Sequence, residues 1–124
     1  MKPLFQLCPV EHLEATVDYY RELGLRPLDW PDDETVLLGP DTTGEPTIAL
    51  VRDPQESALS AGGVFDAGDV DAFYAAHPEL DWLVPPTDRS FGRYAVFADR
   101  TGTAIRLLDP LRRRAGVLGL AVAS

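Results

Sequence analysis

Cysteine is almost absent from this chain of 124 residues, in which Cys8 is the only one. A single thiol can form neither an intramolecular disulfide nor a cluster of thiolate metal ligands. Cys8 lies in an apolar run, where we interpret it as a small core residue rather than a nucleophile. The composition therefore argues against proteins that depend on a disulfide framework or on a zinc–thiolate centre.

Positive charge is also scarce. Lys2 is the only lysine, and 11 basic residues against 20 acidic residues give a formal net charge of −9. Nucleic-acid binding requires a basic surface to neutralise phosphates, so this balance argues against a nucleic-acid partner. We interpret the acidic residues mainly as a solvated surface that aids solubility, although they would also concentrate a cationic ligand.

Long apolar runs and histidines are lacking as well. No run approaches the length of about 20 residues that crosses a membrane, and no signal sequence is visible, so we expect a cytoplasmic protein without a membrane partner. His12 is expected at the exposed start of a helix and His77 at a helix C-terminus. Neither forms part of a Ser–His–Asp set, and no glycine-rich phosphate loop or paired-carboxylate motif stands out.

What the sequence does contain is a series of short apolar runs separated by turns, which predicts an α+β fold. A strand at Leu4–Val10 is followed by a helix whose apolar stripe ends at Gly24. That stripe consists of Leu13, Val17, Tyr20 and Leu23. Three strands are expected next, at Leu25–Trp30, Thr35–Leu38 and Thr47–Val51. Residues 53–61 are expected to form a polar connection that contains proline and serine.

The second half repeats this order of elements. It begins with a strand at Gly62–Ala67 and a helix at Val70–His77, which Asp69 caps and Pro78 ends. Three further strands are expected near Trp82–Val84, Arg93–Ala98 and Ala104–Leu108. A constant shift of about 57 residues relates the two halves, as fixed periods do in repeats. We therefore predict two βαβββ modules, residues 1–56 and 57–110, followed by a tail at residues 111–124.

Short motifs within these elements resemble the vicinal oxygen chelate superfamily, which includes glyoxalase I, extradiol dioxygenases and bleomycin-resistance proteins. Tyr19–Leu25 is similar to the aromatic-Tyr…Leu-Gly-Phe helix end of that family. Phe97–Gly102 resembles its Phe-x-Asp-Pro-x-Gly turn, with Arg100 where proline is usual. Asp69–Tyr74 resembles the start of its second helix. The resemblance covers about residues 3 to 110.

The resemblance implies that the modules form a curved mixed sheet of half-barrels, with the helices on the convex side and a ligand site enclosed by the concave faces. It also implies where metal-dependent members hold their metal. The four corresponding positions are Phe5, Ala49, Gly62 and Arg106. None of these side chains ligates a divalent metal, and the fixed positive charge of Arg106 would repel one. We therefore expect neither a metal nor another cofactor.

Alternation along the strands predicts which side chains line the concave faces. The expected ligand contacts are apolar or aromatic apart from one arginine, as is usual in small-molecule sites. They are Phe5, Leu7, Trp30, Ala49, Val51, Tyr94, Val96, Arg106 and Leu108. The alternative interpretation is that these residues only fill the barrel as core.

Arg106 stands in the middle of an otherwise apolar strand, and its guanidinium needs acceptors for five N–H donors. An internal ion pair, or an end that reaches water, would satisfy it without any function. We favour a ligand carboxylate, phenolate or carbonyl.

Together these features favour a metal-independent protein that binds or sequesters an aromatic or polyketide-like molecule carrying an acceptor group, like the antibiotic-sequestering bleomycin-resistance branch. The alternatives are an enzyme on the same scaffold and a structural or regulatory subunit with a vestigial cavity. The enzyme would use cofactor-free acid–base catalysis or, if the ligand positions are misaligned, a metal-dependent lyase or dioxygenase reaction. Because members of this family commonly pair and the tail is apolar, we expect a homodimer.

Overall fold

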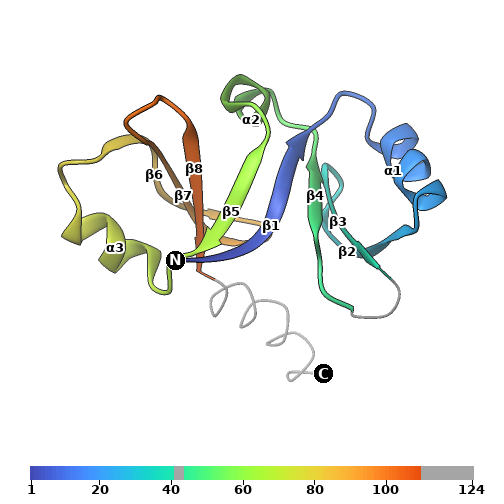
Figure 1. Cartoon of the computed structure of the whole chain (residues 1–124), viewed down its shortest axis with the longest axis horizontal. Helices are drawn as coiled ribbons and strands as arrows, with labels where there is room; N and C mark the ends of the chain where they lie inside the picture. The colour runs from blue at the N-terminus through green and yellow to red at the C-terminus, as the bar shows by residue number, and fades with distance from the viewer. Residues whose placement is uncertain (41–43, 110–124) are drawn as a thin grey trace. The chain divides into compact units, whose positions relative to one another are not determined.

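The computed structural model describes residues 1–40 and 44–109, so the tail predicted at residues 111–124 lies outside the described residues. The chain divides into two compact units. We call Leu4–Gly63 the N-terminal unit, and the residues from Val64 onward, which group with Met1–Pro3, the C-terminal unit. Figure 1 labels the elements of both units.

The N-terminal unit follows the predicted order of strand, helix and three strands. Its elements are β1 (Lys2–Pro9), α1 (Leu13–Glu22), β2 (Leu25–Asp32), β3 (Thr35–Pro40), β4 (Ile48–Val51) and α2 (Pro54–Leu59). The strands are arranged in the order β2-β3-β4-β1. β1 runs parallel to β4, whereas the pairs β2–β3 and β3–β4 are antiparallel.

The C-terminal unit repeats this arrangement. Its elements are β5 (Gly62–Asp66), α3 (Val70–Ala76), β6 (Asp81–Arg89), β7 (Gly92–Ala98) and β8 (Ala104–Asp109). The strand order is β5-β8-β7-β6, again with one parallel pair, β5–β8, and two antiparallel pairs. The predicted α+β fold of two βαβββ modules is therefore confirmed, with a curled mixed sheet and the predicted helix on its convex face.

Each predicted helix packs on one face of its own sheet, because its apolar stripe matches the alternation of the strands. Leu13 and Val17 of α1 are buried against a cluster formed by Val36, Leu38 and Leu50. Val70 of α3 is buried against the equivalent cluster in the C-terminal unit, which consists of Ala95, Phe97 and Leu107. The alternate residues of β3, β4, β7 and β8 consequently lie on the face opposite the helix.

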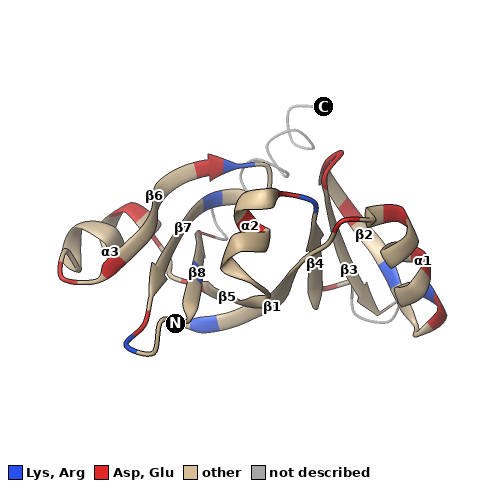
Figure 2. Ribbon diagram, turned by 90° about the horizontal axis from the view of Figure 1, so that it is seen from above, with Lys and Arg blue, Asp and Glu red and all other residues tan. Residues whose placement is uncertain are grey.

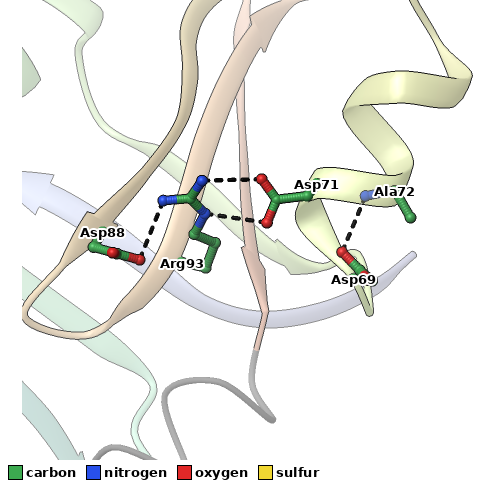
Figure 3. Close-up of polar contacts among 5 residues, drawn as sticks. All are labelled: Asp69, Asp71, Ala72, Asp88 and Arg93. Carbon is green, nitrogen blue, oxygen red and sulfur yellow. Dashed lines mark hydrogen bonds and ion pairs between the residues drawn. The ribbon is translucent and has the colours of Figure 1, made fainter.

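Local signals set the helix ends. Gly24 follows α1 with a φ of +97°, a left-handed conformation that glycine adopts without strain. Asp69 caps α3 as predicted, since its Oδ1 accepts a hydrogen bond of 3.0 Å from the amide of Ala72 (Figure 3).

Among the described residues, no helix combines the length and apolar character that a membrane crossing requires.

The structure corrects one expectation from the sequence and extends another. Residues 53–61 contain the helix α2 rather than only a polar connection, because Asp53 accepts a hydrogen bond from the amide of Gln55 and Pro54 occupies the first turn. The strand expected near Trp82–Val84 extends through two prolines to Arg89. β6 is an edge strand with register shifts, where a missing N–H removes no necessary ladder bond.

Candidate ligand-binding site

The centre of the candidate site is the face of the C-terminal sheet opposite α3. β7 and β8 pair so that Tyr94 lies beside Leu108 and Val96 beside Arg106. On its other side, Arg106 pairs with Val64 of β5. These five side chains share one face, because residues directly opposite each other in a ladder point the same way. All five are buried, so the interior of the unit carries one formal positive charge on this face.

Arg106 has a relative exposure of 0%, and so does Tyr94. The Nε atom of Arg106 donates a hydrogen bond of 3.2 Å to the phenol oxygen of Tyr94. Among the described residues, none accepts a hydrogen bond from its buried Nη1 atom, although the side chain makes other contacts. Removing a charge from water is costly unless polar groups replace the water, and the phenol oxygen of Tyr94 is one such group.

A second arginine and a second aromatic ring complete the cluster. Arg89 ends β6, and Phe91 lies in the turn that leads into β7. The Cζ atom of Arg89 is 5.2 Å from the ring centroid of Phe91 and 5.4 Å from that of Tyr94. The two rings meet edge to face with centroids 5.3 Å apart. Such distances are typical of cation–π and aromatic pairs.

Arg93, the neighbour of Tyr94, points to the other face of the sheet and has a structural role. It binds both carboxylate oxygens of Asp71 on α3, at 3.0 and 3.1 Å, and reaches Asp88 on β6 at 3.2 Å (Figure 3). These hydrogen bonds, chiefly those to Asp71, raise the pKa of Arg93. Adjacent positions on β7 therefore serve different purposes, since Arg93 ties the helix to the sheet.

The remaining predicted contacts lie in the N-terminal unit. Leu7 pairs with Ala49, and Ala49 pairs in turn with Leu37 of β3, on the face opposite α1. Val51 and Phe5 share this face by alternation, and of these predicted contacts only Phe5 keeps partial exposure. Trp30 differs from them, because it lies on the edge strand β2 and is 45% exposed.

Three residues of chemical interest were missed from the sequence. Arg89 and Phe91 were overlooked because β6 was expected to end before Pro85. Glu56 of α2 is only 1% exposed and makes polar contacts of its own, but the helix that buries it was not predicted. The capping signal at Asp53 and Pro54 would have been the clue to it.

Acidic side chains dominate the charged surface of both units. They occur along α1, on α3 and in several connections, whereas basic residues are fewer and more scattered (Figure 2). The cluster around Tyr94 contrasts with this surface, because Arg89 lies over its ring and Arg106 donates a hydrogen bond to its hydroxyl.

A βαβββ module with its helix outside a curled mixed sheet, occurring twice in one chain, is the fold of the vicinal oxygen chelate superfamily that the sequence motifs resemble. Comparison with solved structures finds the same fold. Comparison with family models and with curated proteins finds no match.

Three solved structures illustrate the likeness. A glyoxalase/bleomycin resistance protein/dioxygenase superfamily member from Vibrio splendidus 12B01 has a TM-score of 0.58 at 15% identity, covering 83% of this chain and 94% of that one. The Mn(II)-bound glyoxalase from Novosphingobium aromaticivorans has a TM-score of 0.60 at 17% identity, covering 87% of this chain but 38% of that one. A protein described as NAD-dependent benzaldehyde dehydrogenase from Legionella pneumophila reaches 0.66 at 18% identity, covering 84% and 96%. At these identities the likeness establishes the fold alone.

Because one of these structures holds Mn(II), we asked whether the residues present here fit a metal. The four positions expected from the resemblance carry an aromatic ring, a methyl group, a hydrogen atom and a buried guanidinium. They are Phe5, Ala49, Gly62 and Arg106. Within residues 1–40 and 44–109, no three His, Cys, Asp or Glu side chains gather in a way that would hold an ion. These residues do not fit a divalent metal.

Proposed function

We propose that this protein binds an aromatic or polyketide-like small molecule and that Arg106, rather than a metal ion, contacts the acceptor group of that molecule. The observation that carries the proposal is the pair formed by Arg106 and Tyr94. Both are completely buried on the face opposite α3, and they are joined by a hydrogen bond.

The chemistry of the pair determines what it would bind. A guanidinium offers a planar fork of N–H donors that matches a carboxylate or an enolised carbonyl. Tyr94 and Phe91 add aromatic surface next to that fork, which favours a ligand with a flat ring. Val96 and Leu108 on the same face would contact the apolar part of the ligand. Phe5, Leu7, Trp30, Ala49 and Val51 remain predicted ligand contacts.

The proposed metal independence rests on the same arginine. The family resemblance implies that Arg106 occupies a position at which metal-dependent members carry a metal-ligating side chain. A fixed positive charge cannot donate an electron pair and repels a cation. Arg106 would therefore perform electrostatically what a metal performs in other proteins of this fold, which is to hold an oxygen of the bound molecule.

The test is a calorimetric screen of chelator-treated protein against aromatic acids, their neutral amides and polyketide-like phenols. We expect at least one compound to bind with micromolar or tighter affinity, and the affinity to stay the same after zinc, manganese or iron(II) is added. Binding that requires one of these metals would contradict the proposal, and so would a screen without any binder.

We also propose that the protein is a cytoplasmic homodimer. Sedimentation of the full chain would test its oligomeric state.

A further inference from the structure

The outer face of α1 carries two adjacent stripes of exposed side chains, one acidic and one apolar. The acidic stripe is Glu14, Asp18 and Glu22, and the apolar stripe is Ala15, Tyr19 and Leu23. Residues four apart are neighbours on a helix, so each set forms a continuous line. All six are exposed, because the opposite face of the helix packs on the sheet. Glu14 also interacts electrostatically with Arg52, which follows β4 in the same unit.

The apolar stripe leaves two large side chains in water. Tyr19 is 59% exposed and Leu23 is 62% exposed. The ring of Tyr19 meets that of Tyr20 edge to face, with 5.3 Å between the centroids, so it has less conformational freedom to lose when a partner binds. From Ala15 to Leu23 the stripe is about 12 Å long, at a rise of about 1.5 Å per residue. Adjoining exposed apolar side chains, unlike isolated ones, are a feature of protein-binding surfaces.

One segment of the chain has a composition that complements both stripes. Residues 111–124 contain three of the 11 basic residues, at 112–114, and no acidic residue, in a chain of net charge −9. Nine apolar residues, 115–123, follow the arginines directly. Even at the helical rise of about 1.5 Å per residue, nine residues are long enough to cover a stripe of about 12 Å. Opposite charges beside matching apolar surfaces favour association and fix its register.

We infer that residues 111–124 of one molecule dock on the outer face of α1 in a second copy of the chain. The arginines would contact Asp18 and Glu22, and the apolar run would cover Tyr19 and Leu23. Docking in both directions gives the twofold symmetry of a closed dimer, because each copy supplies one helix and one tail. The inference rests on the proposed homodimer and specifies an interface for it.

The experiment replaces one exposed side chain of the full chain with a photo-reactive one, as Tyr19→p-benzoylphenylalanine. Unlabelled protein and protein labelled with a heavy nitrogen isotope are mixed and irradiated, and mass spectrometry identifies the peptides joined to position 19. We expect these peptides to come from residues 111–124 and to include light–heavy pairs, which only two different molecules produce. The same probe at Leu23 should give the same result. The matched control places it at Tyr74, an exposed aromatic residue of α3, which should not join to the tail.

The charge of α1 provides a second measurement. Asp18→Asn combined with Glu22→Gln removes two exposed carboxylates from the acidic stripe. We expect the dissociation constant of the dimer, measured by sedimentation at low salt, to rise about tenfold, the effect of two exposed ion pairs. The control combines Glu79→Gln with Asp81→Asn, which removes two exposed carboxylates from the C-terminal unit and should leave the constant unchanged.

Several results would overturn the inference. Tail peptides joined to position 19 without any light–heavy pairs would place the tail on its own molecule. A dimer in which position 19 joins to another segment, or to none, would have its interface elsewhere, and the proposed homodimer would stand. Equal weakening by the two double variants would assign the effect to net charge rather than to α1. A chain that sediments as a monomer would contradict both the inference and the proposed homodimer, while the ligand screen tests small-molecule binding separately.

Discussion

Arg106 is the charged residue among the five buried side chains on the face of the C-terminal sheet opposite α3. Its neighbours across the ladder are valines, which contribute apolar burial and no acceptor. The phenol of Tyr94 supplies an acceptor to Nε. In the proposed function the pair links stability and binding, because Tyr94 would orient the arginine for a ligand and also compensates part of its desolvation.

Tyr94→Phe tests this link on the stability side. The change removes one oxygen from a buried face and leaves the Nε donor of Arg106 without that acceptor. We expect the free energy of unfolding to fall by about 1–3 kcal/mol, the range for an unsatisfied buried group. Urea denaturation measures it, with the exposed Tyr19→Phe as control. A loss equal to that of the control would show that this hydrogen bond is unimportant.

Asp99 provides a second test at this scale, since it organises the turn between β7 and β8. Its Oδ1 accepts from the hydroxyl and amide of Thr101 and from the amide of Thr103, at 2.6, 2.8 and 3.0 Å. These hydrogen bonds, first that of the Thr101 hydroxyl, hold the pKa of Asp99 below its ordinary value. A lowered pKa means that the ionised form stabilises the folded state at neutral pH.

That contribution is present above the pKa of the unfolded chain and is lost as pH falls through the lower pKa of the folded state. We therefore expect Asp99→Asn to be less stable than the wild type at pH 7, with the difference shrinking as the solution is acidified below about pH 4. Denaturation at a series of pH values measures the difference. A gap that stays constant or grows towards low pH would exclude the charge of Asp99 as the cause.

Among the elements, β3 shows how a glycine can be required by packing alone. A Cβ atom added at Gly39 would lie 2.3 Å from the backbone oxygen of Glu45 and 2.6 Å from Cδ1 of Leu28. A backbone oxygen cannot rotate away as a flexible side chain can. We expect Gly39→Ala to lower the free energy of unfolding by about 1–3 kcal/mol or more, the range typical of overpacking. A free energy of unfolding within about 0.5 kcal/mol of the wild-type value, measured by urea denaturation, would contradict this expectation.

The sequence predicted the helices and strands best where apolar periodicity was strong. β7 and β8 have a continuous apolar face that fixes the register, so Tyr94, Val96, Arg106 and Leu108 could be placed together. α2 was missed because six residues are too few for a helical period to show. β6 extends beyond the expected Trp82–Val84 through Pro85 and Pro86 to Arg89, since an edge strand tolerates prolines that cannot donate ladder hydrogen bonds. Arg89 and Phe91 were therefore not among the expected site residues.

At the scale of the whole molecule, the repeat explains why the second module is the more informative one. Both modules place their helix and strands alike, and the shift of about 57 residues that relates Ala49 to Arg106 puts an alanine and an arginine at equivalent positions. A charge in one copy and a methyl group in the other indicate that the arginine is not a requirement of the fold. The proposed ligand contact at Arg106 depends on this asymmetry.

The most direct test of the account is therefore Arg106→Met, studied with the tightest aromatic acid from the screen. Methionine fills similar space without a buried charge, so the free energy of unfolding should change little. Calorimetry should show binding weakened by roughly 2–5 kcal/mol, the cost of truncating one partner of a buried charged pair, while Arg100→Met binds like the wild type. An unchanged affinity would contradict the account, and a variant that no longer folds would assign Arg106 to an internal ion pair instead.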